Sequence, residues 1–151
     1  MQLKGDLLVE FDKCLALQVK LTKNIIEAEH NKYLKEFGIS SDQGLLLKYV
    51  IDFPGSTQTQ ISSALHKDKT SVTRMIDTLV KKNKIIRKNS TQDRRIFKIY
   101  ITKETEENAQ AISPIFEKRQ EELKKLIDDT EYEITLKVLN QIKDYYKGLN
   151  K

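Results

Sequence analysis

Residues 68–102 read DKTSVTRMIDTLVKKNKIIRKNSTQDRRIFKIYIT. In the first half, apolar side chains recur with a helical period from Val72 to Leu79, and Asp68 is well suited to cap such a helix. The second half has a short apolar strand, a polar tip, and then apolar and polar residues that alternate from Phe97 onwards, which is typical of a half-buried strand. The stretch therefore predicts an amphipathic helix followed by a β-hairpin with a long tip.

A second, shorter helix is predicted just before this stretch, in the segment TQTQISSALH, and a tight linker, His66–Lys67, joins the two helices. A short helix, a tight turn, a polar-faced helix and a hairpin, in this order, make up a winged helix-turn-helix. The second helix of this motif fits the major groove of B-DNA, where hydroxyl groups and cations of its first turns reach base edges. The side chains expected to do so are Lys69, Thr70, Ser71, Thr73 and Arg74.

The hairpin tip carries Asp93, Arg94 and Arg95. An exposed tip adds little to a core, so these charges are expected to contact a partner. The two arginines suit the minor groove, where narrow A·T-rich DNA concentrates negative potential. Asp93 would repel a phosphate, so it is expected to orient one of the arginines.

The positive charge of the chain is concentrated in the same region. Residues 57–103 hold twelve Lys/Arg and three Asp/Glu, a net charge of +9, whereas the other residues hold fifteen basic and nineteen acidic side chains. A basic segment of this kind favours a polyanionic partner such as double-stranded DNA.

The N-terminal third has a helical period. Apolar positions between Leu7 and Leu15, including Phe11 and Cys14, predict one helix, and a further helical run through residues 21–33 is expected to end near Gly38. Ser40 or Ser41 would cap the next helix, and Phe53-Pro54-Gly55 would stop it.

Helices are also predicted after the hairpin. The last one is expected to follow Thr130, with Glu133 completing a capping box. The predicted fold is mainly α with a small β-hairpin wing, a winged helix-turn-helix flanked by N- and C-terminal helices. The apolar face of the last helix comprises Ile134, Val138, Ile142, Tyr145 and Leu149.

The chain resembles the MarR family of winged helix-turn-helix transcriptional regulators. The resemblance rests on Asp93 and Arg95, on the Ile101-Thr102 pair that follows them, and on the segment TSVTRMIDTLVKKNKIIRK before them. The sequence departs from the family pattern at two places where glycine is usual. These are Asn83, after the recognition helix, and Thr105, after the wing strand.

The resemblance implies a homodimer that reads a roughly palindromic site, with a small-molecule effector that changes the spacing of its two lobes. It divides the chain into N-terminal dimerisation helices (1–38), a DNA-binding lobe (40–103) and C-terminal dimerisation helices (104–151). It also implies that Arg95 enters the minor groove and that Asp93 positions it.

Two alternative functions remain open at this stage. A winged helix can serve as a protein-interaction module without a DNA target, but Arg74, Arg94 and Arg95 argue against this. A DNA-binding redox sensor would use Cys14, because some members of the family sense peroxides through a cysteine in the first helix. On the predicted helix, however, Cys14 shares a face with Leu7 and Phe11, where cysteine behaves as a small hydrophobe.

Other classes of function find little support in the residues. No glycine-rich phosphate loop or nucleophile–base arrangement is present, so an enzyme is not expected, and no cofactor is predicted. His30 and His66 are too isolated for a zinc site. The longest apolar runs are far short of a membrane span, and the N-terminus lacks the apolar core of a secretory signal. These features predict a cytoplasmic protein without a membrane partner.

Overall fold

The computed structural model describes residues 10–149, apart from the side chains of residues 110, 111 and 113. The chain forms two compact units, which divide between Ile112 and Ser113 and are described separately. The elements are η1 (Phe11–Lys13), α1 (Leu15–Leu34), η2 (Lys35–Phe37), α2 (Ser41–Asp52), β1 (Ser56–Thr57), α3 (Gln58–Leu65), α4 (Lys69–Lys81), β2 (Ile85–Asn89), β3 (Phe97–Ile101), α5 (Lys103–Leu126) and α6 (Asp129–Gly148).

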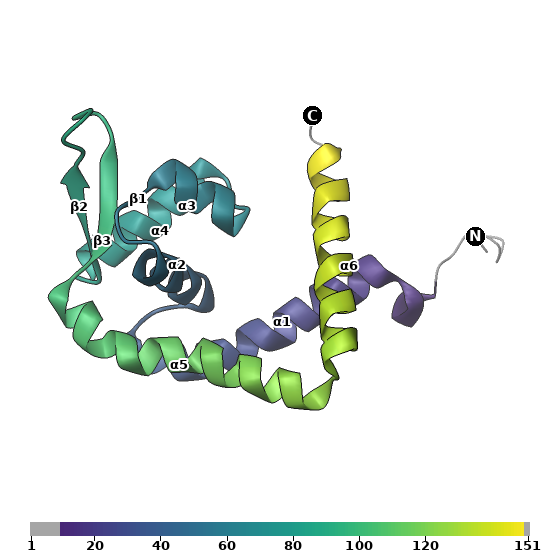
Figure 1. Ribbon diagram of the computed structural model, residues 1–151. Coiled ribbons are helices and arrows are strands. Elements are labelled where there is room, and N and C mark those ends of the chain that lie inside the picture. The colour runs from purple at the N-terminus through teal and green to yellow at the C-terminus, as the bar shows by residue number, and fades with distance from the viewer. Residues whose placement is uncertain (1–9, 150–151) are drawn as a thin grey trace, which may run out of the picture. The chain divides into compact units, whose positions relative to one another are not determined.

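The first unit contains a three-stranded antiparallel sheet with the order β1-β3-β2 (Figure 1). Strands β2 and β3 form the predicted hairpin, with Ile85 opposite Ile101 and Asn89 opposite Phe97. Strand β1 was not predicted, because its two residues are too few to show an alternating pattern. It places Thr57 beside Lys98. The predicted fold class, mainly α with a small wing, is confirmed.

The core of the first unit lies among α2, α3, α4 and the sheet. The predicted apolar stripe of α4 is buried at Val72, Ile76 and Leu79, and Met75 is half-buried. Burying each such side chain stabilises the fold by roughly 1.5–3 kcal/mol. The other buried apolar side chains are Leu34, Ile39, Leu46, Leu47, Val50, Ile61, Ile85, Ile99 and Ile112.

Two left-handed residues end elements as the sequence predicts. Gly38 (φ 67°) follows η2, and Asn83 (φ 54°) lies in the turn between α4 and β2. Asparagine tolerates this conformation better than other residues with a β-carbon, so the turn forms without the glycine usual at this position. Ser40 caps α2 in a capping box with Gln43, and α2 ends just before Phe53.

The N-terminal prediction is partly wrong. Leu7 lies outside the described residues. Phe11–Lys13 form only a 3-10 turn, and Cys14 has an extended backbone (φ −79°, ψ 106°) at the start of α1. Cys14 therefore does not share a helical face with Phe11. A pattern of four apolar positions is too short to overcome the cost of nucleating a helix.

The second unit contains the C-terminal half of α5 and all of α6. The predicted start of the last helix is wrong by two residues, because Asp128, and not Thr130, is the N-cap. The Asp128 carboxylate accepts a hydrogen bond from the Glu131 amide (2.8 Å), and the Glu131 side chain accepts one from the Asp128 amide (3.2 Å). An aspartate also suits the positive end of the helix dipole better than a threonine.

Candidate nucleic-acid interface

Helix α4 begins at a fully formed N-cap. The Asp68 carboxylate accepts hydrogen bonds from the Ser71 amide (2.8 Å) and from the Ser71 hydroxyl (2.6 Å). The hydroxyl and amide of Ser71 together hold the pKa of Asp68 below its ordinary value, so the cap is charged at neutral pH. The Ser71 hydroxyl hydrogen is therefore engaged within the protein.

Thr73 is also held from inside the lobe. Its hydroxyl donates to the carbonyl of Lys69 (2.7 Å), one turn earlier. The side-chain amide of Gln58, at the start of α3, donates to the same Thr73 hydroxyl and to the Lys69 carbonyl. These bonds fix the first turn of α4 against α3. The Thr73 methyl group remains available for an apolar contact with a base, such as the methyl group of a thymine.

The remaining predicted residues of α4 present unengaged polar groups. Lys69, Thr70 and Arg74 are exposed, and their side chains make no hydrogen bond or ion pair with any other residue in 10–149. They lie in the first turns of a helix whose opposite face is buried. This is the placement that base readout in a groove requires.

An ion pair joins α4 to the wing. Arg87 of β2 contacts Asp77 of α4, with 2.5 Å between Nη2 and Oδ1. A guanidinium on one element and a carboxylate on the other restrict how the hairpin can move relative to α4. The ion pair thereby links the hairpin directly to the helix.

The wing tip orients Arg95 as the sequence predicts for the pair with Asp93. The Asp93 carboxylate accepts from the Arg95 amide (2.9 Å) and from both Nε (3.2 Å) and Nη2 (3.3 Å) of its side chain. The Arg95 side chain is nevertheless 91% exposed. Asp93 thus holds the guanidinium through Nε and Nη2, while the rest of the group remains open to a partner.

The bonds from Arg95, the backbone amide first, hold the pKa of Asp93 below its ordinary value. The tip is also closed by its backbone, because the Ser90 amide donates to the Ile96 carbonyl (2.8 Å) and the Ile96 amide donates to the Asp93 carbonyl (3.0 Å). Arg94 is exposed, and its carbonyl accepts from the Asn89 side chain (2.8 Å).

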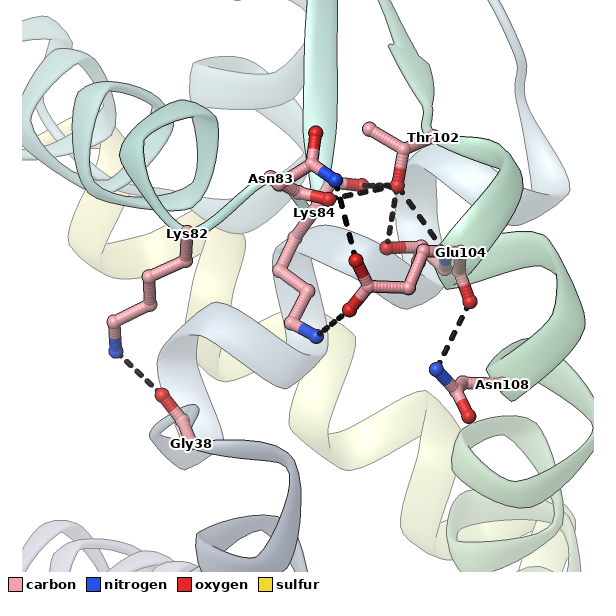
Figure 2. A network of polar contacts seen from close by, with 8 residues as sticks. Gly38, Lys82, Asn83, Lys84, Thr102, Glu104 and Asn108 are labelled. Carbon is pink, nitrogen blue, oxygen red and sulfur yellow. Dashed lines mark hydrogen bonds and ion pairs between the residues drawn. The ribbon is translucent and has the colours of Figure 1, made fainter.

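A polar network joins the end of the wing to the turn after α4 (Figure 2). The Thr102 hydroxyl donates to the Asn83 carbonyl (2.8 Å), and the Glu104 carboxylate accepts from Asn83 (3.2 Å) and Lys84 (2.9 Å). Lys84, first among these, lowers the pKa of Glu104. The buried Thr105 hydroxyl lies 3.1 Å from that of Thr102, so the residue at this second departure from the family pattern is part of a well-bonded junction.

Sequence reasoning did not identify several residues that shape this interface. Gln58, Arg87 and Glu104 act through partners 10 to 21 positions away along the chain. No local pattern reveals such pairings. Only Asp77 carried a signal of its own, because it is the one acidic residue of α4.

The remaining predicted sites lie apart from this surface. Cys14 is a half-buried free thiol, and Phe11, three residues earlier, is exposed. Within residues 10–149 no three His, Cys, Asp or Glu side chains are grouped as metal ligands are, and no helix there has the length and apolar character of a membrane span.

Comparisons with known proteins agree with this geometry. Residues 39–97 match the model of the MarR family. The chain is 29% identical over 113 residues to the HTH-type transcriptional regulator BilQ of Clostridioides difficile (strain CD3), covering 75% of this chain and 76% of that protein.

Solved structures share the fold. The alignment with a crystal structure of the S. aureus MepR–DNA complex covers 91% of this chain and 99% of the MepR chain, with a TM-score of 0.82 at 22% identity. The alignment with a MarR/EmrR family transcriptional regulator from Acinetobacter sp. ADP1 covers 93% of this chain and 99% of that protein, with a TM-score of 0.83 at 19% identity. The winged-helix segment of this chain, residues 39–97, is thus similar to the MarR family of transcriptional regulators.

Proposed function

We propose that this protein is a dimeric, sequence-specific DNA-binding regulator. Helix α4 would lie in the major groove and the wing tip in the adjacent minor groove. One observation carries the proposal. The side chains of Lys69, Thr70 and Arg74 have no hydrogen bond or ion pair to a described residue, and their helix is linked through an Arg87–Asp77 ion pair to the wing that presents Arg95. A neutral protein-interaction module would have no need for cations at both places.

Similar proteins support DNA as the partner. The S. aureus MepR structure is a complex with DNA, and reduced AbfR, with a TM-score of 0.73 at 20% identity, is also bound to DNA. The charge distribution points the same way, since the +9 segment between residues 57 and 103 contains both proposed contact elements.

A homodimer would account for the apolar surface of the second unit. Helix α6 exposes Ile134, Tyr145 and Leu149 in the single chain, whereas soluble monomers rarely expose large contiguous apolar surfaces. Two copies would place two α4 helices in successive major grooves, about one helical turn apart. The site would then be roughly palindromic.

A small-molecule effector is the remaining part of the proposal. An effector that binds one spacing of the two lobes more tightly than another changes DNA affinity through that difference in free energy. The family resemblance is what suggests such a ligand, and release of DNA on adding candidate compounds would identify it.

The base-reading role of α4 and the role of the wing can be tested separately. Arg74→Ala should reduce the preference for a selected duplex over a scrambled one by roughly 1–3 kcal/mol, because arginine reads guanine through two parallel hydrogen bonds. Arg95→Ala should weaken binding most for A·T-rich flanks, where the minor groove is narrow. Affinities from fluorescence anisotropy on both duplexes measure these effects.

Lys137→Ala is a matched control, since Lys137 is an exposed cation of α6 with no ion pair to a described residue. It should bind both duplexes as the wild type does. Equal behaviour of all three variants and the wild type would show that α4 and the wing tip are merely solvated, and would favour the interaction module.

A further inference from the structure

Two lysines face each other across the wing. Lys88 of β2 and Lys98 of β3 are register partners, so their side chains leave the same face of the sheet and begin only about 5 Å apart. The Lys88 ammonium lies 5.1 Å from the centroid of the Tyr100 ring, next along that face. We call Lys88, Lys98 and Tyr100 the lysine face.

A direct pair of like charges reduces the stability of a hairpin. Two arginines of the wing are paired with carboxylates, Arg87 with Asp77 and Arg95 with Asp93, whereas Arg94 projects from the tip and faces no like charge across the strands. Neither Lys88 nor Lys98 forms an ion pair with any residue in 10–149. The lysine face therefore concentrates positive charge with no counter-charge from the described chain.

The position of the pair indicates what the counter-charge is. Lys88 and Lys98 lie one register step below Asn89 and Phe97, where the paired strands end and the tip begins. A groove that receives the tip is bordered by phosphates of the DNA backbone. The lysine ammonium, a point charge on a flexible stem, can bind a backbone phosphate without a fixed bidentate geometry.

From this placement we infer that Lys88 and Lys98 together bind a backbone phosphate beside the groove entered by the wing tip. The inference rests on the proposed function and adds a sequence-independent interaction to it. The lysine face would raise affinity for every duplex, while Arg95 and α4 set the preference among duplexes.

The test compares Lys88→Gln/Lys98→Gln with the wild type on a selected and a random duplex over a series of salt concentrations. The slope of log affinity against log salt should become shallower by about 0.9 for each phosphate that the variant no longer neutralises. Affinity should fall by the same factor for both duplexes. Lys88→Arg/Lys98→Arg, which keeps both charges, should retain the wild-type slope.

Lys118→Gln/Lys137→Gln controls for net charge, because it removes two exposed cations of α5 and α6 that form no ion pair with a described residue. A lysine-face variant with the same slope as this control would overturn the inference and leave the proposed function standing. A wild type that binds no duplex even at low salt would overturn both.

Lys98→Glu separates a structural role from a binding role. It places a carboxylate opposite Lys88 and keeps the interaction of Lys88 with Tyr100, so the melting temperature should not fall. DNA affinity should fall further than in Lys118→Glu. A lower melting temperature together with unchanged relative affinity would show that Lys98 serves the fold and not a phosphate.

Discussion

At the scale of single residues, the turn between α4 and β2 depends on the backbone conformation of Asn83. Its backbone is left-handed, a conformation that is strained for residues with a β-carbon. The strain is smallest for asparagine. Asn83→Ala should therefore lower the free energy of unfolding by about 1–2 kcal/mol. Asn83→Gly loses the same hydrogen bond to Glu104 but permits the conformation, so it should remain nearer to wild type. Urea denaturation measures both, and equal losses in the two variants would assign the effect to the hydrogen bond instead.

Three carboxylates give the fold a defined dependence on pH. Hydrogen bonds from Ser71, Arg95 and Lys84 hold the pKa values of Asp68, Asp93 and Glu104 below their ordinary values. Each charged form therefore contributes stability that is present above the ordinary carboxyl pKa and is lost as pH falls through the lowered one. The melting temperature should fall on acidification below about pH 4. A melting temperature that rises on acidification there would contradict these assignments.

The roles of residues that interact with close neighbours along the chain could be predicted from the sequence. The caps Ser40 and Asp68, the left-handed residues Gly38 and Asn83, and the Asp93–Arg95 pair all act within a few positions. The internal use of the Ser71 and Thr73 hydroxyls was not predicted. For Thr73 it depends on Gln58, which only the packing of α3 against α4 brings close.

At the scale of elements, strand β3 is the centre of the wing because it pairs with both β1 and β2. Its Ile99 side chain is fully buried. Ile99→Ala should lower the free energy of unfolding by about 2–5 kcal/mol through reduced burial and a residual cavity. Ile86→Ala on β2 is the matched control, because Ile86 is exposed, and it should cost well under half as much. Chemical denaturation compares the two, and similar losses would mean that β3 is not central to the core.

The accuracy of the predicted elements follows their length and the strength of their pattern. Helices α2 and α4 and both hairpin strands have clear periods and were predicted closely. The N-terminal turn and strand β1 were not, because both are short, and α6 is capped by Asp128, two residues before the predicted Thr130. The apolar face of α6 has a clear helical period, and its Ile134, Tyr145 and Leu149 side chains are exposed among the described residues.

At the scale of the whole molecule, the proposed dimer predicts that residues of α6, outside the proposed DNA-binding elements, affect DNA binding. Ile134→Glu combined with Tyr145→Glu places two charges on the exposed apolar face of α6. Because charges are excluded from the centre of dimer interfaces, this variant should sediment as a monomer and lose most of its DNA affinity. Lys137→Glu on the same helix should remain dimeric. A double variant that stays dimeric would place the interface elsewhere.

The fold was predictable because the order of elements and the wing motif are local features of the sequence, and the family model matches residues 39–97 within it. The division into dimerisation helices and a DNA-binding lobe stays a prediction. It concerns contacts between two copies, and a single chain describes only the surfaces available for them.

Affinity for a duplex enriched from a random pool, compared with a scrambled duplex of equal composition at near-physiological salt, tests the central claim most directly. A sequence-specific regulator should bind the enriched duplex at least about a thousand-fold more tightly. Its site should show two half-sites about one helical turn apart. Equal affinity for both duplexes, or no binding to either, would contradict a base-reading role for α4.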